Sequence, residues 1–206
     1  MSQNLVDLHC HILPGIDDGA KNLDVSMALL RKEVQDGVAG IVFTPHFHYE
    51  RISVEDFAAK RRAAFLQVAK AAKETGLPLA GKLGAEVYFT TALPSLDLRA
   101  LAFAKSNYIL IEFPTTCYPA GIDETLYAVR QRGYTPILAH VERLDCLIDE
   151  WEKLEELKES GIILQMNTDG LIGGRFDRWV RRCRALVEDG YIDVLGTDAH
   201  NMTSRP

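Results

Sequence analysis

The sequence lacks a long apolar run, a signal segment and an excess of basic charge. No stretch approaches the roughly 18 consecutive apolar residues of a membrane span, so we expect no membrane insertion. The N-terminal letters MSQNLVDLH hold neither a basic leader nor an apolar signal core, which predicts a cytoplasmic protein. The net charge of −6 disfavours a nucleic-acid partner bound over a broad basic face. The one compact basic run, Lys60 to Arg62, is expected to be a solvated helix face.

The sequence also lacks any recognisable cysteine motif. Its four cysteines, Cys10, Cys117, Cys146 and Cys183, form no C-x-x-C pair, which argues against a disulfide framework or a thiolate metal cage. None of them is followed by an arginine at the sixth position, the spacing at which a cysteine nucleophile and an arginine flank a phosphate-binding loop. A cysteine nucleophile is therefore excluded.

The apolar pattern predicts an α/β protein. At 206 residues the chain is expected to form a single domain, residues 1–206. The clearest helical patterns cover Asp24 to Asp36 and Ser53 to Thr75, and Ser53 with Asp56 forms a helix-capping pattern. Five helical patterns end at a glycine and are followed by an apolar, β-branched run. Glycine suits this position because it easily adopts the left-handed conformation that often follows a helix. These glycines are Gly37, Gly76, Gly133, Gly161 and Gly190.

Strand-like runs alternate with these helices. Together with Leu5 to His9 and Asn107 to Phe113, the runs after the glycines give seven candidate strands. Near-continuous apolar runs such as ILIEF are typical of parallel strands covered on both faces. The pattern fits a distorted seven-stranded barrel or an open doubly wound sheet, and periodicity does not separate the two.

Polar residues gather at the carboxyl ends of these candidate strands, where parallel α/β proteins place their reactive groups. They are His9, His11, His46, Glu86, Glu112, Asn167, His140, Asp198 and His200. Scattered core packing does not predict histidine and carboxylate at so many strand ends, and a buried carboxylate is costly unless it is paired or binds a cation. Imidazole and carboxylate without thiolate suit manganese, iron, zinc or cobalt.

The segment LVDLHCHILPGIDDG, residues 5–19, places two histidines one residue apart at the end of an apolar run. In an extended segment His9 and His11 project to one side and can hold a single ion, while Cys10 points to the other side. Asp17 and Asp18 follow a turn that can fold back over the site. One of these aspartates is a candidate ligand and the other a candidate cap of the next helix.

These residues, in this order, resemble the polymerase and histidinol phosphatase (PHP) superfamily. The similarity is closest to the bacterial manganese-dependent protein-tyrosine phosphatases that regulate capsule and exopolysaccharide synthesis. It runs from DLHCHILPGIDDGAKNLDVSMAL through IVFTPHFH, GAEVY, YILIEFP and ILAHVERL to GTDAHNMTSRP. The resemblance implies a distorted (β/α)7 TIM-like barrel with its active site at the C-terminal ends of the strands.

The resemblance also implies a ligand set for up to three divalent ions, most commonly Mn2+. His9, His11, Glu86 and Asp198 would hold the first ion; Glu86 would bridge to a second, held by Glu112 and His140; Asp18, His46 and His200 would hold a third. The resemblance assigns His48 no ligand role, so we expect it at the rim. Glu86, His140, Arg143 and Arg205 are expected to be catalytic, and the two arginines are also expected to bind the phosphate.

The expected reaction is hydrolysis of a phosphomonoester by a hydroxide that bridges two ions. A phenol, with a pKa near 10, leaves more easily than the alkoxide of serine, which favours phosphotyrosine. Phe47 and Tyr49, beside His46, are candidates to flank the tyrosine ring. The resemblance further implies a substrate on a bacterial tyrosine autokinase that controls polysaccharide synthesis.

Three alternatives stay open. The same metals could serve a PHP-type phosphatase acting on a small molecule such as histidinol phosphate, or a phosphodiesterase acting on nucleic-acid ends. A non-catalytic docking module could keep the fold and bind the kinase tail without hydrolysis. An amidohydrolase also begins with His-x-His, but that group usually bridges its metals with a lysine, whereas Glu86 and Glu112 stand at the comparable strand ends here.

Overall fold

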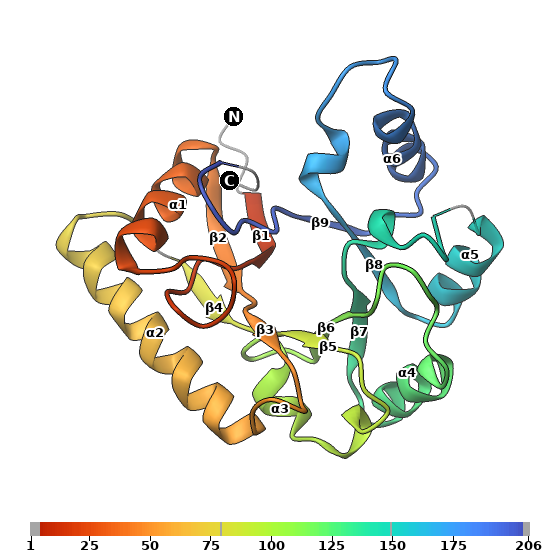
Figure 1. Ribbon diagram of the computed structural model, residues 1–206, viewed down its shortest axis with the longest axis horizontal. Coiled ribbons are helices and arrows are strands. Elements are labelled where there is room, and N and C mark those ends of the chain that lie inside the picture. The colour runs from red at the N-terminus through yellow and green to blue at the C-terminus, as the bar shows by residue number, and fades with distance from the viewer. Residues whose placement is uncertain (1–4, 79, 149, 204–206) are drawn as a thin grey trace.

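The computed structural model describes residues 5–78, 80–148 and 150–203, which form an α/β fold with parallel strand pairs (Figure 1). In chain order the strands are β1 (Leu5–Cys10), β2 (Val38–Phe43), β3 (His46–Phe47), β4 (Gly81–Leu83), β5 (Glu86–Tyr88), β6 (Tyr108–Glu112), β7 (Thr135–Leu138), β8 (Ile163–Asn167) and β9 (Val194–Gly196). The helices are α1 (Leu23–Gln35), α2 (Val54–Glu74), α3 (Leu98–Leu101), α4 (Ile122–Gln131), α5 (Trp151–Glu159) and α6 (Arg178–Glu188). Short 3-10 turns are η1 (Leu93–Ser95), η2 (Val141–Arg143) and η3 (Thr168–Leu171).

The strands form two parallel sheets with the orders β1-β2-β4 and β3-β5-β6-β7-β8-β9. Figure 1 shows α1 and α2 on the outside of the first sheet, and α4 and α5 outside the second. Beyond β9 the chain returns to β1, because Cys10 and Ala199 form a parallel bridge and Asp198 N donates to His9 O at 2.7 Å. This return brings the last strand end against the first.

Two of the seven expected strands are each broken into two short strands. The run from Val38 is interrupted at Thr44 and Pro45, since proline cannot donate to a ladder. The run from Gly81 is interrupted at Gly84, whose amide donates to Phe43 O at 2.8 Å. Both breaks fall where one sheet passes into the other, so the strands do not form a single uniformly paired barrel.

The helix predictions are confirmed to within a residue at the two clearest helices. Ser53 Oγ accepts from Asp56 N at 3.1 Å and caps α2, as its capping pattern predicts. Helix α1 is instead capped by Asn22, whose side chain accepts from Val25 N at 3.0 Å, so neither Asp17 nor Asp18 caps it. All five predicted post-helix glycines have positive φ, between 66° and 92°.

The basic run on α2 differs from the expected solvated face. Arg61 is buried, donates to Ala100 O at 2.7 Å and to Gly84 O, and packs over the Phe57 ring at 5.0 Å. Arg61 thereby ties α2 to the break between β4 and β5, and only its neighbours in the run are exposed. None of the helices in the described part of the chain is long and apolar enough to cross a membrane.

Candidate metal centre

The centre lies at one edge of the strands, because parallel strands bring their carboxyl ends together. Register pairing sets His46 of β3 beside Glu86 of β5, and Tyr88 of β5 beside Glu112 of β6. His140 lies just beyond the end of β7 at Leu138, and Asp198 and His200 lie just beyond the end of β9 at Gly196. His140 and Asp198 have the left-handed φ values of 36° and 52°, a conformation that non-glycine residues adopt at a cost of roughly 1–3 kcal/mol and that clusters at functional sites.

The first group of converging atoms is built on the His-x-His segment. His9 Nε2 and His11 Nε2 lie 3.2 Å apart, and Glu86 Oε2 lies 3.2 Å from the former and 3.1 Å from the latter. Asp198 Oδ1 lies 3.6 Å from His9 Nε2 and 3.4 Å from His11 Nε2. Cys10 Sγ faces away, toward Val42 O at 3.6 Å, as the strand alternation predicts.

The second group shares Glu86. His140 Nε2 lies 2.9 Å from Glu86 Oε1 and 3.7 Å from Glu112 Oε2. His46 Nδ1 also faces both carboxylates, at 3.0 Å from Glu86 Oε2 and 2.8 Å from Glu112 Oε1. Glu86 therefore connects the His-x-His segment to β6 and β7.

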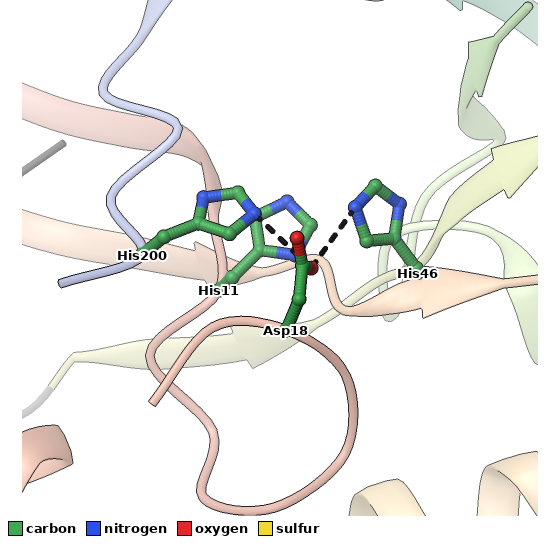
Figure 2. A group of neighbouring side chains, drawn as sticks. All are labelled: His11, Asp18, His46 and His200. Carbon is green, nitrogen blue, oxygen red and sulfur yellow. Dashed lines mark ion pairs between the residues drawn. The ribbon is translucent and has the colours of Figure 1, made fainter. Parts of the chain in front are cut away.

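The third group lies around Asp18 (Figure 2). Asp18 Oδ1 is 3.5 Å from His46 Nε2 and 3.4 Å from His200 Nε2, and His11 lies within the same cluster. The His11 and His200 rings stack with centroids 3.9 Å apart. His46 thus presents one ring nitrogen to the second group and the other to the third.

These distances fit atoms that share a cation. Two ligand atoms bound at about 2.1 Å to one ion lie roughly 3.0 Å apart at a right angle and roughly 3.4 Å apart in a tetrahedron. Within the described residues, Glu86 Oε2, His46 Nδ1 and His140 Nδ1 are buried and form no hydrogen bond. Three imidazole nitrogens face Glu86 Oε2 at 3.0–3.2 Å without donating to it. Each of the three groups could hold a divalent ion.

The electrostatics show how strongly this buried space favours positive charge. Burial opposes protonation of His11, yet the adjacent carboxylates of Asp17 and Glu86 raise its pKa to about 9. Burial likewise opposes protonation of His46 and His140, but Glu112 and Glu86 raise their pKa values to about 11 and about 10. Burial alone would raise the pKa of Glu86, but the surrounding histidines hold it well below its usual value. The same carboxylates would favour a bound divalent cation.

A second layer of polar side chains fixes the histidines. Asp17 Oδ2 accepts from His11 Nδ1 at 2.8 Å and from His46 N at 2.9 Å, so Asp17 orients two members of the centre. Gln165 Oε1 accepts from His140 N at 2.8 Å and lies 3.1 Å from His9 Nδ1. Its amide donates to Asn167 Oδ1 at 2.9 Å, and Asn167 donates to Asp198 Oδ2 at 2.9 Å.

Sequence reasoning missed part of this layer. The sequence pattern identifies Asn167 as a polar residue at a strand end, but it does not identify Gln165 as part of the site. Strand alternation could have identified it, because Gln165 and Asn167 project to the same side of β8. The structure also separates the two neighbouring aspartates: Asp17 supports the histidines and Asp18 lies among the ligand candidates.

The predicted substrate-binding residues have different outcomes. The prediction for Phe47 is wrong, because Phe47 is fully buried and packs on Phe57 with ring centroids 5.0 Å apart. Tyr49 is 45% exposed and lines a cavity near the centre. Arg143 donates to Asp198 Oδ2 at 3.0 Å and to Asp169 Oδ2 at 2.9 Å, which places it beside the first group. Arg205 lies outside the described residues.

His48 lies at the edge of the centre. Its ring centroid is 5.8 Å from that of His46 and 4.9 Å from that of Tyr88. Burial, with Arg51 nearby, lowers the pKa of His48, in contrast to the histidines inside the centre. With His46 and Glu112, His48 forms a further group that could hold an ion.

The fold and the centre together define an α/β protein that gathers histidine and carboxylate groups able to hold divalent ions at the carboxyl ends of parallel strands. Residues 5–206 match the family described as "Capsular polysaccharide synthesis, CpsB/CapC". The chain belongs to this family, which confirms the family resemblance read from the sequence.

Related proteins cover nearly the whole chain. Tyrosine-protein phosphatase CpsB of Streptococcus pneumoniae is 32% identical over 209 residues, which cover 98% of this chain and 85% of that protein. Tyrosine-protein phosphatase YwqE of Bacillus subtilis is 33% identical over 204 residues, which cover 98% of this chain and 79% of that protein. A solved structure from work on YwqE of Bacillus subtilis and CpsB of Streptococcus pneumoniae, described as "unique metal-dependent tyrosine phosphatases", superposes with a TM-score of 0.88 at 30% identity. It covers 98% of this chain and 81% of the solved one.

Proposed function

We propose that this chain is a metal-dependent protein-tyrosine phosphatase. The single observation that carries the proposal is the approach of three histidine nitrogens to one buried oxygen, Glu86 Oε2, which forms no hydrogen bond with the described residues. Burying a carboxylate oxygen that has no hydrogen bond is electrostatically unfavourable, and cations shared between this oxygen and the histidine nitrogens would remove that cost. The relatives named as tyrosine phosphatases supply the substrate class.

We assign the ligands in three sets. His9, His11, Glu86 and Asp198 would hold one ion; Glu86, Glu112 and His140 a second; and Asp18, His46 and His200 a third. The donor atoms are imidazole nitrogens and carboxylate oxygens with no thiolate, which suits Mn2+ as the native metal, with iron, zinc or cobalt as substitutes. Bound there, the ions would neutralise phosphoryl charge and activate water for attack on phosphorus.

The chain's own residues then account for substrate placement. Arg143 keeps 28% of its side chain exposed while two carboxylates hold its guanidinium beside the centre. A guanidinium fixed in this way can offer its remaining N–H groups to a phosphoryl oxygen. We assign the same role to Arg205. The buried side chains of Glu86 and His140 lie 2.9 Å apart, and we assign both a catalytic role as ligands that would hold an ion beside the reacting phosphate.

The wider setting follows from the family. We propose that residues 1–206 act as one phosphatase domain, and that the two sheets together form a distorted (β/α)7 barrel. The substrate is proposed to be a phosphotyrosine on a bacterial tyrosine autokinase that controls capsular or exopolysaccharide synthesis, and the site of action the bacterial cytoplasm.

Comparing three substrates on one enzyme preparation tests this function. A phosphotyrosine peptide, histidinol phosphate and a single-stranded oligonucleotide would be supplied with Mn2+, and phosphate release or strand cleavage measured. We expect kcat/KM to be highest for the phosphotyrosine peptide. A preference for histidinol phosphate or for the oligonucleotide would overturn the proposal.

The docking alternative is tested with His140→Ala. We expect this variant to lose phosphotyrosine hydrolysis, while a module that only binds would show no hydrolysis in the wild-type protein either. Peptide binding measured by calorimetry on both proteins separates loss of chemistry from loss of binding.

A further inference from the structure

A cavity of about 660 Å³ opens beside the centre, a size within the range of small-ligand sites. Part of its lining is the centre itself, through Asp17, Asp18, His46 and Glu112. The remaining lining is supplied by Ile16, His48, Arg51, Ile52, Lys60 and Tyr88. A substrate whose phosphate reaches the centre through this cavity would therefore contact apolar, aromatic and basic side chains on the way.

A second cavity of about 370 Å³ adjoins residues that line the first. The two share His48, Arg51 and Tyr88, and the second is also lined by Tyr49, Glu50, Phe89 and Thr90. The shared residues thus stand where a group seated at the centre would connect to the rest of a longer substrate. A small phosphate ester would need only the first cavity, whereas a polypeptide would occupy both.

Aromatic surfaces mark the passage between the cavities. The His48 and Tyr88 rings lie with centroids 4.9 Å apart and an interplanar angle of 34°. Both side chains are half-buried, so one surface of the pair remains open to the cavities. Flat rings of this kind favour contact with another aromatic ring in an offset-stacked or edge-to-face arrangement.

Arg51 provides a positive charge at the same place. Its backbone N–H donates to His48 O at 3.0 Å, which fixes the turn, but its exposed guanidinium forms no hydrogen bond or ion pair with the residues described in the structure. The other basic residue of the first cavity, Lys60, already donates to Ile16 O at 3.2 Å. Glu50 also lines the second cavity, but the guanidinium of Arg51 is uncommitted and can bind an acidic group of a substrate.

We propose that the two cavities form one channel for an acidic phosphotyrosine-containing polypeptide. The phosphotyrosine ring lies against His48 and Tyr88, and Arg51 binds a carboxylate side chain adjacent to the phosphotyrosine. This inference rests on the proposed phosphatase function and names the sequence context that the site selects. Arg51 is a specificity residue, because it touches the polypeptide beside the reacting group.

Two phosphotyrosine peptides test this inference. They differ only in the residues flanking the phosphotyrosine, which are glutamate in one and glutamine in the other. For the wild-type enzyme we expect kcat/KM to be about two- to fivefold higher for the glutamate peptide, chiefly through a lower KM, as is typical of an exposed charge pair. In Arg51→Glu the preference should reverse, and in Arg51→Lys it should persist in weakened form.

Arg62→Glu is the matched control. Arg62 is exposed on α2, and its substitution changes the net charge by the same amount as Arg51→Glu. We expect Arg62→Glu to keep the wild-type preference for the glutamate peptide. A loss of preference in both variants would mean that overall charge, and not Arg51, selects the substrate, and would overturn the inference.

The remaining outcomes separate this inference from the proposed function. Equal kcat/KM for the two peptides in the wild type, or an unchanged preference in Arg51→Glu, would overturn the channel while leaving the phosphatase intact. Failure of the wild type to hydrolyse either peptide would overturn both. As a second variant, Tyr88→Leu should raise KM for both peptides about equally, because it removes the ring contact and not the charge. No change in KM would contradict the aromatic contact.

Discussion

His9 Nε2 and His11 Nε2 face each other at 3.2 Å, and both lie within 3.2 Å of the same carboxylate oxygen, Glu86 Oε2. Two imidazole lone pairs repel at this distance unless a proton or a cation lies between them. The alternation of β1 explains why the two rings share a side, and their complete burial explains why water does not separate them. The segment is therefore arranged around positive charge.

Removing one of these rings should remove metal. We expect His11→Ala to lower phosphotyrosine hydrolysis by more than the roughly 10–100-fold typical of disrupting an outer-shell partner, because His11 is assigned as a direct ligand. Elemental analysis of the purified variant should show fewer bound ions per chain. Wild-type metal content together with wild-type activity would contradict this ligand assignment.

Asp17 should act through His11 and not as a ligand. Its hydrogen bond from His11 Nδ1 overcomes the effect of burial and lowers the pKa of Asp17 to about 2, so the side chain is ionised in the folded protein. We expect Asp17→Asn to weaken Mn2+ affinity by about 10–100-fold. Because the ligands remain, activity should recover at saturating Mn2+, unlike that of His11→Ala. A defect that excess metal does not relieve would place Asp17 in the chemistry itself.

Close packing against the histidine pair predicts a stability effect. A Cβ added at Gly196 would lie 2.6 Å from His9 Cβ and 3.2 Å from His9 N. We expect Gly196→Ala to destabilise the protein by about 1–3 kcal/mol, the usual cost of overpacking, and to lower its melting temperature. Gly174→Ala is the matched control, because a Cβ there meets nothing within 4 Å. Equal melting temperatures for the two variants would contradict this reading of the packing.

Glu33, which belongs to none of the assigned ligand sets, predicts a pH dependence of stability. Burial and the neighbouring Asp7 raise its pKa from the ordinary value of 4.5 to about 7. Below pH 4.5 Glu33 is protonated in both the folded and the unfolded chain. Between pH 4.5 and 7 the unfolded chain ionises first, so the folded state loses stability as the pH rises and the loss then levels off.

The glutamine of Glu33→Gln cannot ionise, so this variant should not lose stability through this position as the pH rises. We expect its stability relative to the wild type to increase from pH 4.5 to 7 by on the order of 1–3 kcal/mol and to remain constant above that. Urea unfolding of both proteins at pH 5, 6, 7 and 8, at fixed metal concentration, measures the difference. A difference independent of pH would show that Glu33 does not titrate abnormally.

The sequence predicts the order of helices and strands better than it predicts where two of the strands are interrupted. Glycines at helix ends and apolar runs identify the alternation of helices and parallel strands, because both signals depend on local backbone preference. The break at Thr44 and Pro45 has a local signal, because proline cannot donate to a ladder. The break at Gly84 has no such signal: it lies where one sheet passes into the other, and Arg61 reaches Gly84 O from a helix whose local charge predicts a solvated face.

The centre could be predicted because strand ends that are distant in sequence converge once the strands are parallel. The error at Phe47 arose from adjacency in sequence: alternation puts His46 and His48 on one side and Phe47 on the other, in the core. The roles of Asp17 and Asp18 needed the structure, since neighbouring residues of a turn point in directions that sequence does not specify. Gln165 was missed because an amide within an apolar strand carries no charge signal.

The most direct test of the metal account is phosphotyrosine hydrolysis by protein stripped of metal and checked by elemental analysis. We predict that the stripped protein has no measurable activity and that added Mn2+ restores it in proportion to the ions bound. Full activity in protein shown to contain no bound metal would contradict the account.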